Sequence, residues 1–254
     1  AQAQSGPLLA DLRALGADAI ECPAIAIAPP ADYAPLDAAL AGLAQYDWLI
    51  FTSANGVRAV FDRLAGLGPP WAHTLPPGLK VGAIGPATAA TLAEYGVTAD
   101  FVPDTYVAEA VVAQIGAVAG ARVLLPRADI ARAVLADGLR ARGAQVTQVD
   151  AYRTLAGAGD PRVRALLEAG QVDVVTFTSS STVRFFLEML EGLGLDPAVA
   201  RATLSRTQVV CIGPITAATA QEQGLAVAAV AAEYTAAGVV AAIQALGPPA
   251  PHLT

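Results

Sequence analysis

The sequence predicts an α/β protein made of two similar domains, each a parallel sheet flanked by helices. The first reason is a repeat. Residues 47–53 (DWLIFTS) return as residues 173–179 (DVVTFTS), and residues 84–91 (IGPATAAT) return as residues 212–219 (IGPITAAT). The matching segments lie 126 and 128 residues apart, and copies of about 120 residues are too long for a solenoid repeat and suit two domains. The second reason is the alternation of short β-rich runs with helical stretches, which is typical of parallel sheets with right-handed crossovers.

Each expected strand is a short apolar run that ends at a turn, and each expected helix has apolar residues at helical spacing. The expected strands are residues 18–22, 47–52, 80–84, 98–102, 122–126, 145–150, 172–178, 207–212 and 226–230. The expected helices are residues 6–15, 55–66, 87–95, 106–117, 129–142, 161–169, 181–191, 215–223 and 235–245. The glycines at positions 16, 96, 143 and 224 each directly follow one of these helices, where a left-handed cap is favoured.

Two stretches at corresponding places are expected to be extended linkers between the domains. Residues 23–31 and 151–157 each follow an expected strand and lead into polar or proline-rich sequence. One part of the repeat lacks its partner. Residues 139–143 resemble residues 12–16, but the strand and turn before the later copy, residues 122–127, have no earlier counterpart. We therefore expect that the natural gene product begins further upstream, or that those residues were lost.

Composition and charge exclude several classes of protein. Hydrophobic residues make up 55% of the chain and charged residues 15%, which excludes a disordered protein. No apolar run is long enough to cross a bilayer, and we expect neither a signal peptide nor a membrane partner. A net charge of −7 without Lys/Arg clusters argues against nucleic acid as a partner.

The cysteines and histidines indicate a reducing compartment and no metal site. Cys22 and Cys211 fit buried, reduced thiols of a cytoplasmic protein, and a lone disulfide is the less favoured alternative. The only histidines are His73 and His252, and no CxxC, HxH or HExxH pattern occurs. We therefore expect no metal centre.

The Phe-Thr-Ser turns join an apolar strand to the start of a helix. Free backbone N–H groups and a partial positive charge at a helix N-terminus suit a carboxylate or phosphate. Ser53 and Ser179, with Thr52 and Thr178, are therefore candidate ligand contacts. For a single copy, helix capping alone is the better interpretation. Two copies in matching domains that face one cleft favour ligand binding instead.

The Ile-Gly-Pro turns have the same strand–turn–helix character. Gly85 and Gly213 let the backbone approach a ligand, and proline suits the first helical turn. Thr88 and Thr216 place hydroxyls at the helix start. Neither turn is a dinucleotide fingerprint or a P-loop, because G-x-G-x-x-G and Gly-Lys-Ser/Thr are both missing, so a nicotinamide dehydrogenase is disfavoured.

Arginine and tyrosine side chains near strand ends and linkers complete the candidates. The arginines with such positions are Arg58, Arg127, Arg132, Arg153 and Arg184. A solvated surface charge is the alternative for each, and Arg127 is the best candidate for a carboxylate contact because it directly follows an expected strand. Tyr152 lies on the second linker, where its phenol either donates a proton to a leaving oxygen or packs. The two histidines allow no Ser-His-Asp triad.

In order and spacing these motifs resemble the uroporphyrinogen-III synthase family over nearly the whole chain. The resemblance depends on the Phe-Thr-Ser strand ends, the Gly-Pro-x-Thr-Ala turn at 213–217, Tyr-Arg-Thr at 152–154 and Ala-x-Glu-Tyr-Thr at 231–235. It implies two interleaved α/β domains joined by a two-stranded ladder formed from the linkers. The implied domains are residues 1–28 with 157–254, and residues 32–150.

The resemblance also implies an activity, the closure of linear hydroxymethylbilane to uroporphyrinogen III with inversion of ring D and loss of water. The family uses no metal or organic cofactor. Tyr152 matches the family's linker tyrosine, which assists hydroxyl departure. Ser179 and Thr216 match its binding residues, and Ser53 and Thr88 hold the analogous places. We expect a monomer with a small-molecule substrate. The alternative is a non-catalytic two-domain binding protein for an anionic metabolite, which would not need Tyr152.

Overall fold

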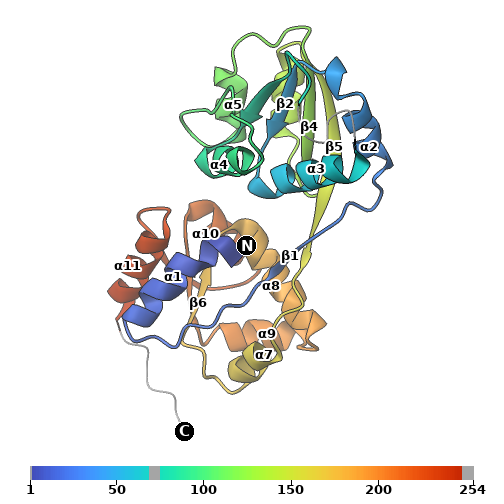
Figure 1. Ribbon diagram of the computed structural model, residues 1–254. Coiled ribbons are helices and arrows are strands. Elements are labelled where there is room, and N and C mark those ends of the chain that lie inside the picture. The colour runs from blue at the N-terminus through green and yellow to red at the C-terminus, as the bar shows by residue number, and fades with distance from the viewer. Residues whose placement is uncertain (1, 69–74, 248–254) are drawn as a thin grey trace. The chain divides into compact units, whose positions relative to one another are not determined.

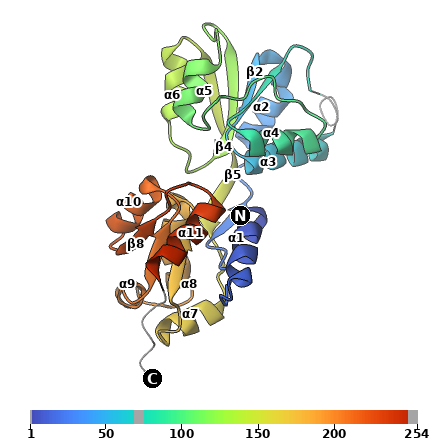
Figure 2. The ribbon, with the colours of Figure 1, turned by 90° about the vertical axis from the view of Figure 1, so that its left-hand side faces the viewer.

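The computed structural model of the chain describes residues 2–68 and 75–247, which divide into two compact units. Unit 1 is Ala1–Ala26 with Leu155–Thr254, and unit 2 is Ile27–Thr154. In each unit helices cover both faces of a parallel sheet (Figures 1 and 2). The predicted fold class is therefore confirmed.

The sheet of unit 2 has the strand order β1-β5-β4-β2-β3. Its strands are β1 (Ile25–Ala28), β2 (Trp48–Phe51), β3 (Lys80–Ala83), β4 (Arg122–Ala128) and β5 (Gln145–Ala156). The pairs β2·β3, β2·β4 and β4·β5 are parallel. β1 lies within residues 23–31 and β5 runs on to Ala156, so both stretches expected to be extended contain strand, and the two strands are neighbours.

Side chains of β2 alternate between two cores, one on each face of the sheet. The helices of unit 2 are α2 (Ala34–Ala41), η1 (Leu43–Gln45), α3 (Ala54–Leu67), α4 (Pro86–Glu94), α5 (Ala108–Gln114) and α6 (Val134–Ala141). Leu49 and Phe51 pack with α2, α3 and α4, whereas Trp48 and Ile50 pack with α5 and α6 (Figure 2). A strand buried on both faces explains why residues 48–51 are continuously apolar.

Unit 1 has a three-stranded parallel sheet with the order β6-β7-β8. Its elements are α1 (Gln2–Ala14), α7 (Pro161–Glu168), β6 (Val174–Phe177), α8 (Ser180–Gly192), α9 (Pro197–Leu204), β7 (Gln208–Cys211), α10 (Pro214–Glu222), β8 (Val227–Val230) and α11 (Ala236–Leu246). Val209 and Cys211 of β7 face the core under α7–α10. Val210 faces the opposite core, where α1 lies beside α11 (Figure 1).

Two predicted strands are wrong. Residues 18–22 are not in a strand. By the repeat they correspond to the start of β5, which pairs with β4, and the described part of unit 1 holds no counterpart of β4 to pair with them. Of residues 98–102, only Phe101 forms a bridge, to Gly82. Here the Asp100 carboxylate accepts the Val81 N–H at 2.7 Å, and Pro103 has no N–H to extend the ladder.

Three further findings concern membranes, metals and thiols. Within residues 2–68 and 75–247, no helix is both long and apolar enough to cross a membrane. The same ranges contain no group of three acidic, cysteine or histidine side chains that could hold a metal, and His73 and His252 lie outside them. Cys211 is buried and Cys22 half-buried, and both are free thiols.

Candidate functional site

Ser53 begins α3 at the carboxyl end of β2. The sequence folds this way because an extended Ser53 follows a buried strand and its Oγ accepts the backbone N–H of Gly56 at 3.0 Å. The same Oγ lies 2.9 Å from the phenolic oxygen of Tyr152. The hydroxyl predicted as a ligand contact thus both caps the helix and holds the predicted catalytic tyrosine. Thr52, the residue before it, is half-buried.

A register shift in the sheet sets the direction of Tyr152. Arg127 pairs with Asp150, but the next residue, Ala128, pairs with Tyr152, so β5 has one extra residue at this point. Such a shift turns the following side chain to the other face of the sheet. Ala151 and Tyr152 consequently pack in the same core, on the α3 side, and Tyr152 is only 8% exposed.

Arg127 is a buried cation with an unsatisfied donor. It is 8% exposed, its Nη1 donates to the Arg132 carbonyl at 2.7 Å, and its Nε is buried without a hydrogen-bond partner. Among the described residues no carboxylate pairs with it. Burial lowers the pKa of Arg127, and its charge lowers the pKa of the nearby Tyr152 phenol. A buried guanidinium with an unpaired N–H carries an unbalanced positive charge that favours negative charge nearby.

Burial dominates the acidity of Tyr152. Desolvation raises the pKa of the phenol, while the Ser53 hydrogen bond and the Arg127 charge oppose that rise. The group is therefore protonated at neutral pH. We call Ser53, Tyr152 and Arg127 the candidate cluster, in which Tyr152 is hydrogen-bonded to Ser53 and lies within the electrostatic influence of Arg127. Its phenol can donate a proton to a leaving oxygen, and the positive charge of Arg127 favours the phenolate that remains.

The Gly-Pro turn of unit 2 lies on the strand next to this cluster. Gly85 is the extended N-cap residue of α4, which follows β3, and Pro86 is the first helical residue. A side chain at Gly85 would meet the Tyr106 ring at 3.0 Å, so this glycine allows the close packing of Tyr106. Thr88 is 4% exposed and Gly85 is also buried, so Pro86 and Ala87 are the exposed residues of the turn.

Unit 1 repeats both turns with different partners. Ser179 caps α8 in a reciprocal capping box with Thr182, and Gly213 caps α10. Thr216 is 5% exposed, whereas Thr178 is exposed. The Ser180 hydroxyl donates to the Ile215 carbonyl at 3.3 Å and links the two helix starts. The candidate residues of unit 1 therefore come together at one end of its own sheet.

The other candidate arginines have separate surroundings. Arg153 donates to the Pro29 carbonyl at 2.9 Å, and Arg132 supplies the carbonyl that Arg127 contacts. Arg58 lies 3.7 Å from Glu94 in an exposed ion pair. Arg184 lines a pocket of about 250 Å³ in unit 1.

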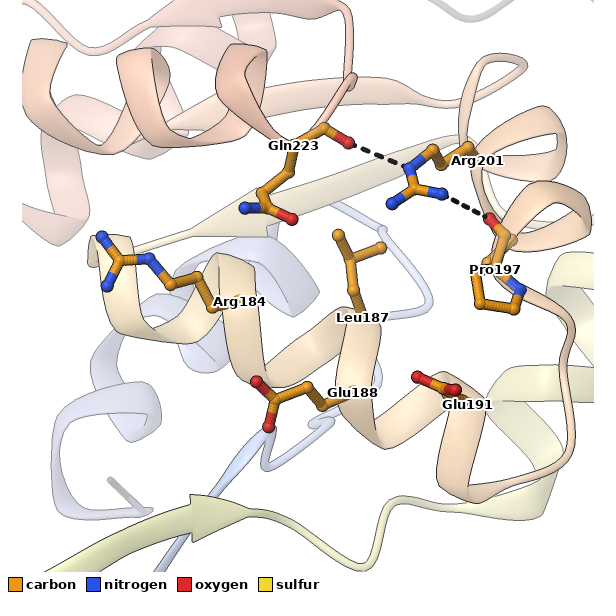
Figure 3. Close-up of a pocket in the computed structure, with 8 residues that line it drawn as sticks. Arg184, Leu187, Glu188, Glu191, Pro197, Arg201 and Gln223 are labelled. Atoms are coloured by element: carbon orange, nitrogen blue, oxygen red, sulfur yellow. Dashed lines mark hydrogen bonds between the residues drawn. The ribbon is translucent and has the colours of Figure 1, made fainter. Parts of the chain in front are cut away.

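Figure 3 shows this pocket of unit 1, formed by α8, α9 and the end of α10. Glu188 and Glu191 also line it, and Arg201 is held by the carbonyl oxygens of Gln223 and Pro197 at 3.1 and 3.4 Å. None of the residues of the two polar turns line this pocket, and its volume is below the range usual for small-molecule sites.

Comparison with known proteins identifies the family. The family model "Uroporphyrinogen-III synthase HemD" matches residues 7–241. The uroporphyrinogen-III synthase of Synechococcus elongatus is 39% identical over 249 residues, which are 96% of this chain and 92% of that protein. The porphyrin biosynthesis protein HemD of Ruminiclostridium josui is 30% identical over 87% of this chain, and the match spans 42% of that longer protein.

A solved structure agrees with the fold. A mutant uroporphyrinogen III synthase from Thermus thermophilus matches 95% of this chain and 94% of its own, with a TM-score of 0.63 and 22% identity. That identity supports the fold alone, while the family model and the closer sequence matches carry the family. The chain belongs to the uroporphyrinogen-III synthase family.

Proposed function

We propose that this protein closes hydroxymethylbilane to uroporphyrinogen III, with inversion of ring D and loss of water, as a lyase of tetrapyrrole biosynthesis. The observation that carries the proposal is the cluster of a protonated Tyr152, its partner Ser53 and the buried Arg127. Family membership supports the proposal, because the relative from Synechococcus elongatus is a uroporphyrinogen-III synthase and matches nearly the whole chain.

The proposed chemistry begins with loss of the substrate hydroxyl. Tyr152 donates its proton as the C–O bond breaks, so the hydroxyl leaves as water and its bonding electrons go with the oxygen. Arg127 stabilises the phenolate that remains. The substituted carbon of ring D then attacks the cationic methylene carbon to form the spiro intermediate. The bond from that ring carbon to its original methylene bridge breaks, the released methylene carbon bonds to the free α-carbon of ring D, and the proton lost from that carbon returns to the phenolate.

Binding and positioning account for the rest of the proposed function. The uncatalysed closure gives the uninverted isomer, so the protein has to hold the flexible chain in the geometry of the less favoured attack. We propose that Thr52, Ser53, Gly85 and Thr88 in unit 2, and Thr178, Ser179, Gly213 and Thr216 in unit 1, bind substrate carboxylates around their helix starts. We also propose a cytoplasmic monomer that needs no cofactor.

The test is product analysis. The protein is incubated with enzymatically generated hydroxymethylbilane, the products are oxidised, and type I and type III uroporphyrins are separated. We expect type III above the uncatalysed background. Type I alone would reject the synthase activity and leave the alternative, a non-catalytic binding protein for an anionic metabolite.

A further inference from the structure

Unit 2 has a groove beside Tyr152 that the proposed chemistry does not use. Its volume is about 470 Å³, which lies within the range of small-molecule sites. One wall is the outward face of α3, where Asn55, Arg58 and Asp62 recur at helical spacing. Ala151 and Tyr152 of β5 also line the groove. Whatever occupies the groove therefore touches the tyrosine assigned to the reaction.

Small side chains make room in the groove. On α3 these are Ala59 and Gly66, and on the strands they are Ala28 and Ala151. A space of this kind beside a cationic side chain suits a flat ring that carries a carboxylate arm. The charged residues of the lining decide where such a carboxylate would bind.

Arg63 lines the groove, but its guanidinium is already paired with a carboxylate. Its Nε and Nη2 donate to the two carboxylate oxygens of Asp37 at 2.7 and 2.5 Å, and its guanidinium lies 4.1 Å from the centre of the Tyr33 ring. The Arg63 hydrogen bonds lower the pKa of Asp37. Because this ion pair is bidentate, Arg63 does not readily exchange Asp37 for a ligand carboxylate.

Arg58 is the cation of the groove that is available. Its Nη2 lies 3.7 Å from the Glu94 carboxylate, beyond hydrogen-bond distance, and the two side chains are 45% and 60% exposed. Exposed pairs of this kind contribute about 0–1 kcal/mol. Asp62, the acidic residue of the lining, already accepts a hydrogen bond from Tyr95 Oη at 2.9 Å.

We propose that this groove holds one carboxylate-bearing pyrrole ring of the substrate, and that Arg58 exchanges Glu94 for that carboxylate. The inference rests on the proposed function, since it assigns a subsite for the same polycarboxylate substrate. Arg58 acts in binding: it fixes the ring beside Tyr152 and takes no part in proton transfer.

Two substitutions with opposite expectations test the proposal. Arg58→Gln removes the cation and is expected to raise KM for hydroxymethylbilane about fivefold, the effect of one exposed ion pair of about 1 kcal/mol, while kcat changes less. Glu94→Gln removes the competing carboxylate and is expected to leave KM unchanged or lower it. Arg140→Gln is the matched control, because Arg140 is a similarly exposed arginine, paired with Asp137, on α6 against the other face of the sheet.

The outcomes separate this proposal from the proposed function. A KM for Arg58→Gln within twofold of the Arg140→Gln value overturns the subsite. The proposed function still stands in that case if the wild type forms type III product. An equal rise in KM for Arg58→Gln and Glu94→Gln also overturns it, because that pattern indicates a structural ion pair. If the wild type forms only type I product, fluorescence titration with uroporphyrin III replaces KM: about fivefold weaker binding by Arg58→Gln alone supports the groove, and equal binding rejects it.

Discussion

Replacement of Tyr152 by phenylalanine separates catalysis from stability. The ring is buried in the core between α3 and the sheet, and phenylalanine keeps it there. The change removes one hydrogen bond of 2.9 Å, and Ser53 Oγ keeps the Gly56 N–H, so the free energy of unfolding should fall by only about 1 kcal/mol. Loss of a general acid should lower kcat about 100-fold, or about 2.7 kcal/mol on the barrier.

The assay measures the rate of type III product above the uncatalysed type I background, with circular dichroism and urea unfolding on the same samples. Tyr95→Phe is the matched control, because Tyr95 Oη donates to Asp62 at 2.9 Å in the same unit but is not in the cluster. Its kcat should stay close to that of the wild type. A Tyr152→Phe protein with native circular dichroism and a kcat within twofold of wild type would remove the phenol from the mechanism.

The other predictions concern the charge of Arg127, the serine caps of α3 and α8, and the two thiols. Arg127→Met should lower kcat/KM at least about tenfold yet leave the free energy of unfolding equal or higher, because it removes a buried, partly unsatisfied cation; a large loss of stability in urea would contradict this. Ser179→Ala should lower the free energy of unfolding by about 1 kcal/mol with little change in kcat. Ser53→Ala should also lower kcat, because it removes the partner of Tyr152. Equal effects of the two substitutions on kcat would argue against different roles for the two serines. Burial raises the pKa of Cys22 and Cys211 from 9.0 to about 11, so both thiols should resist Ellman's reagent at pH 8 until the protein unfolds. Because the unfolded chain loses these protons first, the free energy of unfolding should fall as pH rises from about 9 to 11, and a flat profile would contradict the raised values.

The strand–turn–helix units could be predicted from the sequence because their signals are local. An apolar strand is followed within a few residues by a helix-start signal, which is a serine cap at β2–α3 and a proline at the first helical position at β7–α10. One helix could have been found by the same signals and was missed. α9 begins with Asp196 as N-cap, its carboxylate accepting the Ala198 N–H at 2.8 Å, followed by Pro197.

The parts that could not be predicted depend on residues distant in the sequence. The strand expected at residues 18–22 fails because its apolar residues need a neighbouring strand, and a propensity pattern does not reveal whether one is present. The candidate cluster depends on the one-residue shift between β4 and β5, which alternation along β5 gives no reason to expect. Tyr152 and Arg127 were candidates on position alone, but the contact of Tyr152 with Ser53 comes from tertiary structure.

The differences between the two copies place the proposed proton transfer in unit 2. In unit 1 the third residue of the helix is Thr182, whose hydroxyl completes a capping box, so the hydrogen bonds of Ser179 are satisfied within its own turn. In unit 2 the same position is Gly56, which has no side chain, and a Cβ there would lie 3.4 Å from the Pro126 carbonyl oxygen. Ser53 therefore has a hydroxyl left for Tyr152, and by the repeat the residue that corresponds to Tyr152 is Ile25 of β1, which has no polar group. The repeat supplies two helix starts of the same shape. Only the helix start of unit 2 has an acid, because glycine stands there in place of threonine and tyrosine in place of isoleucine.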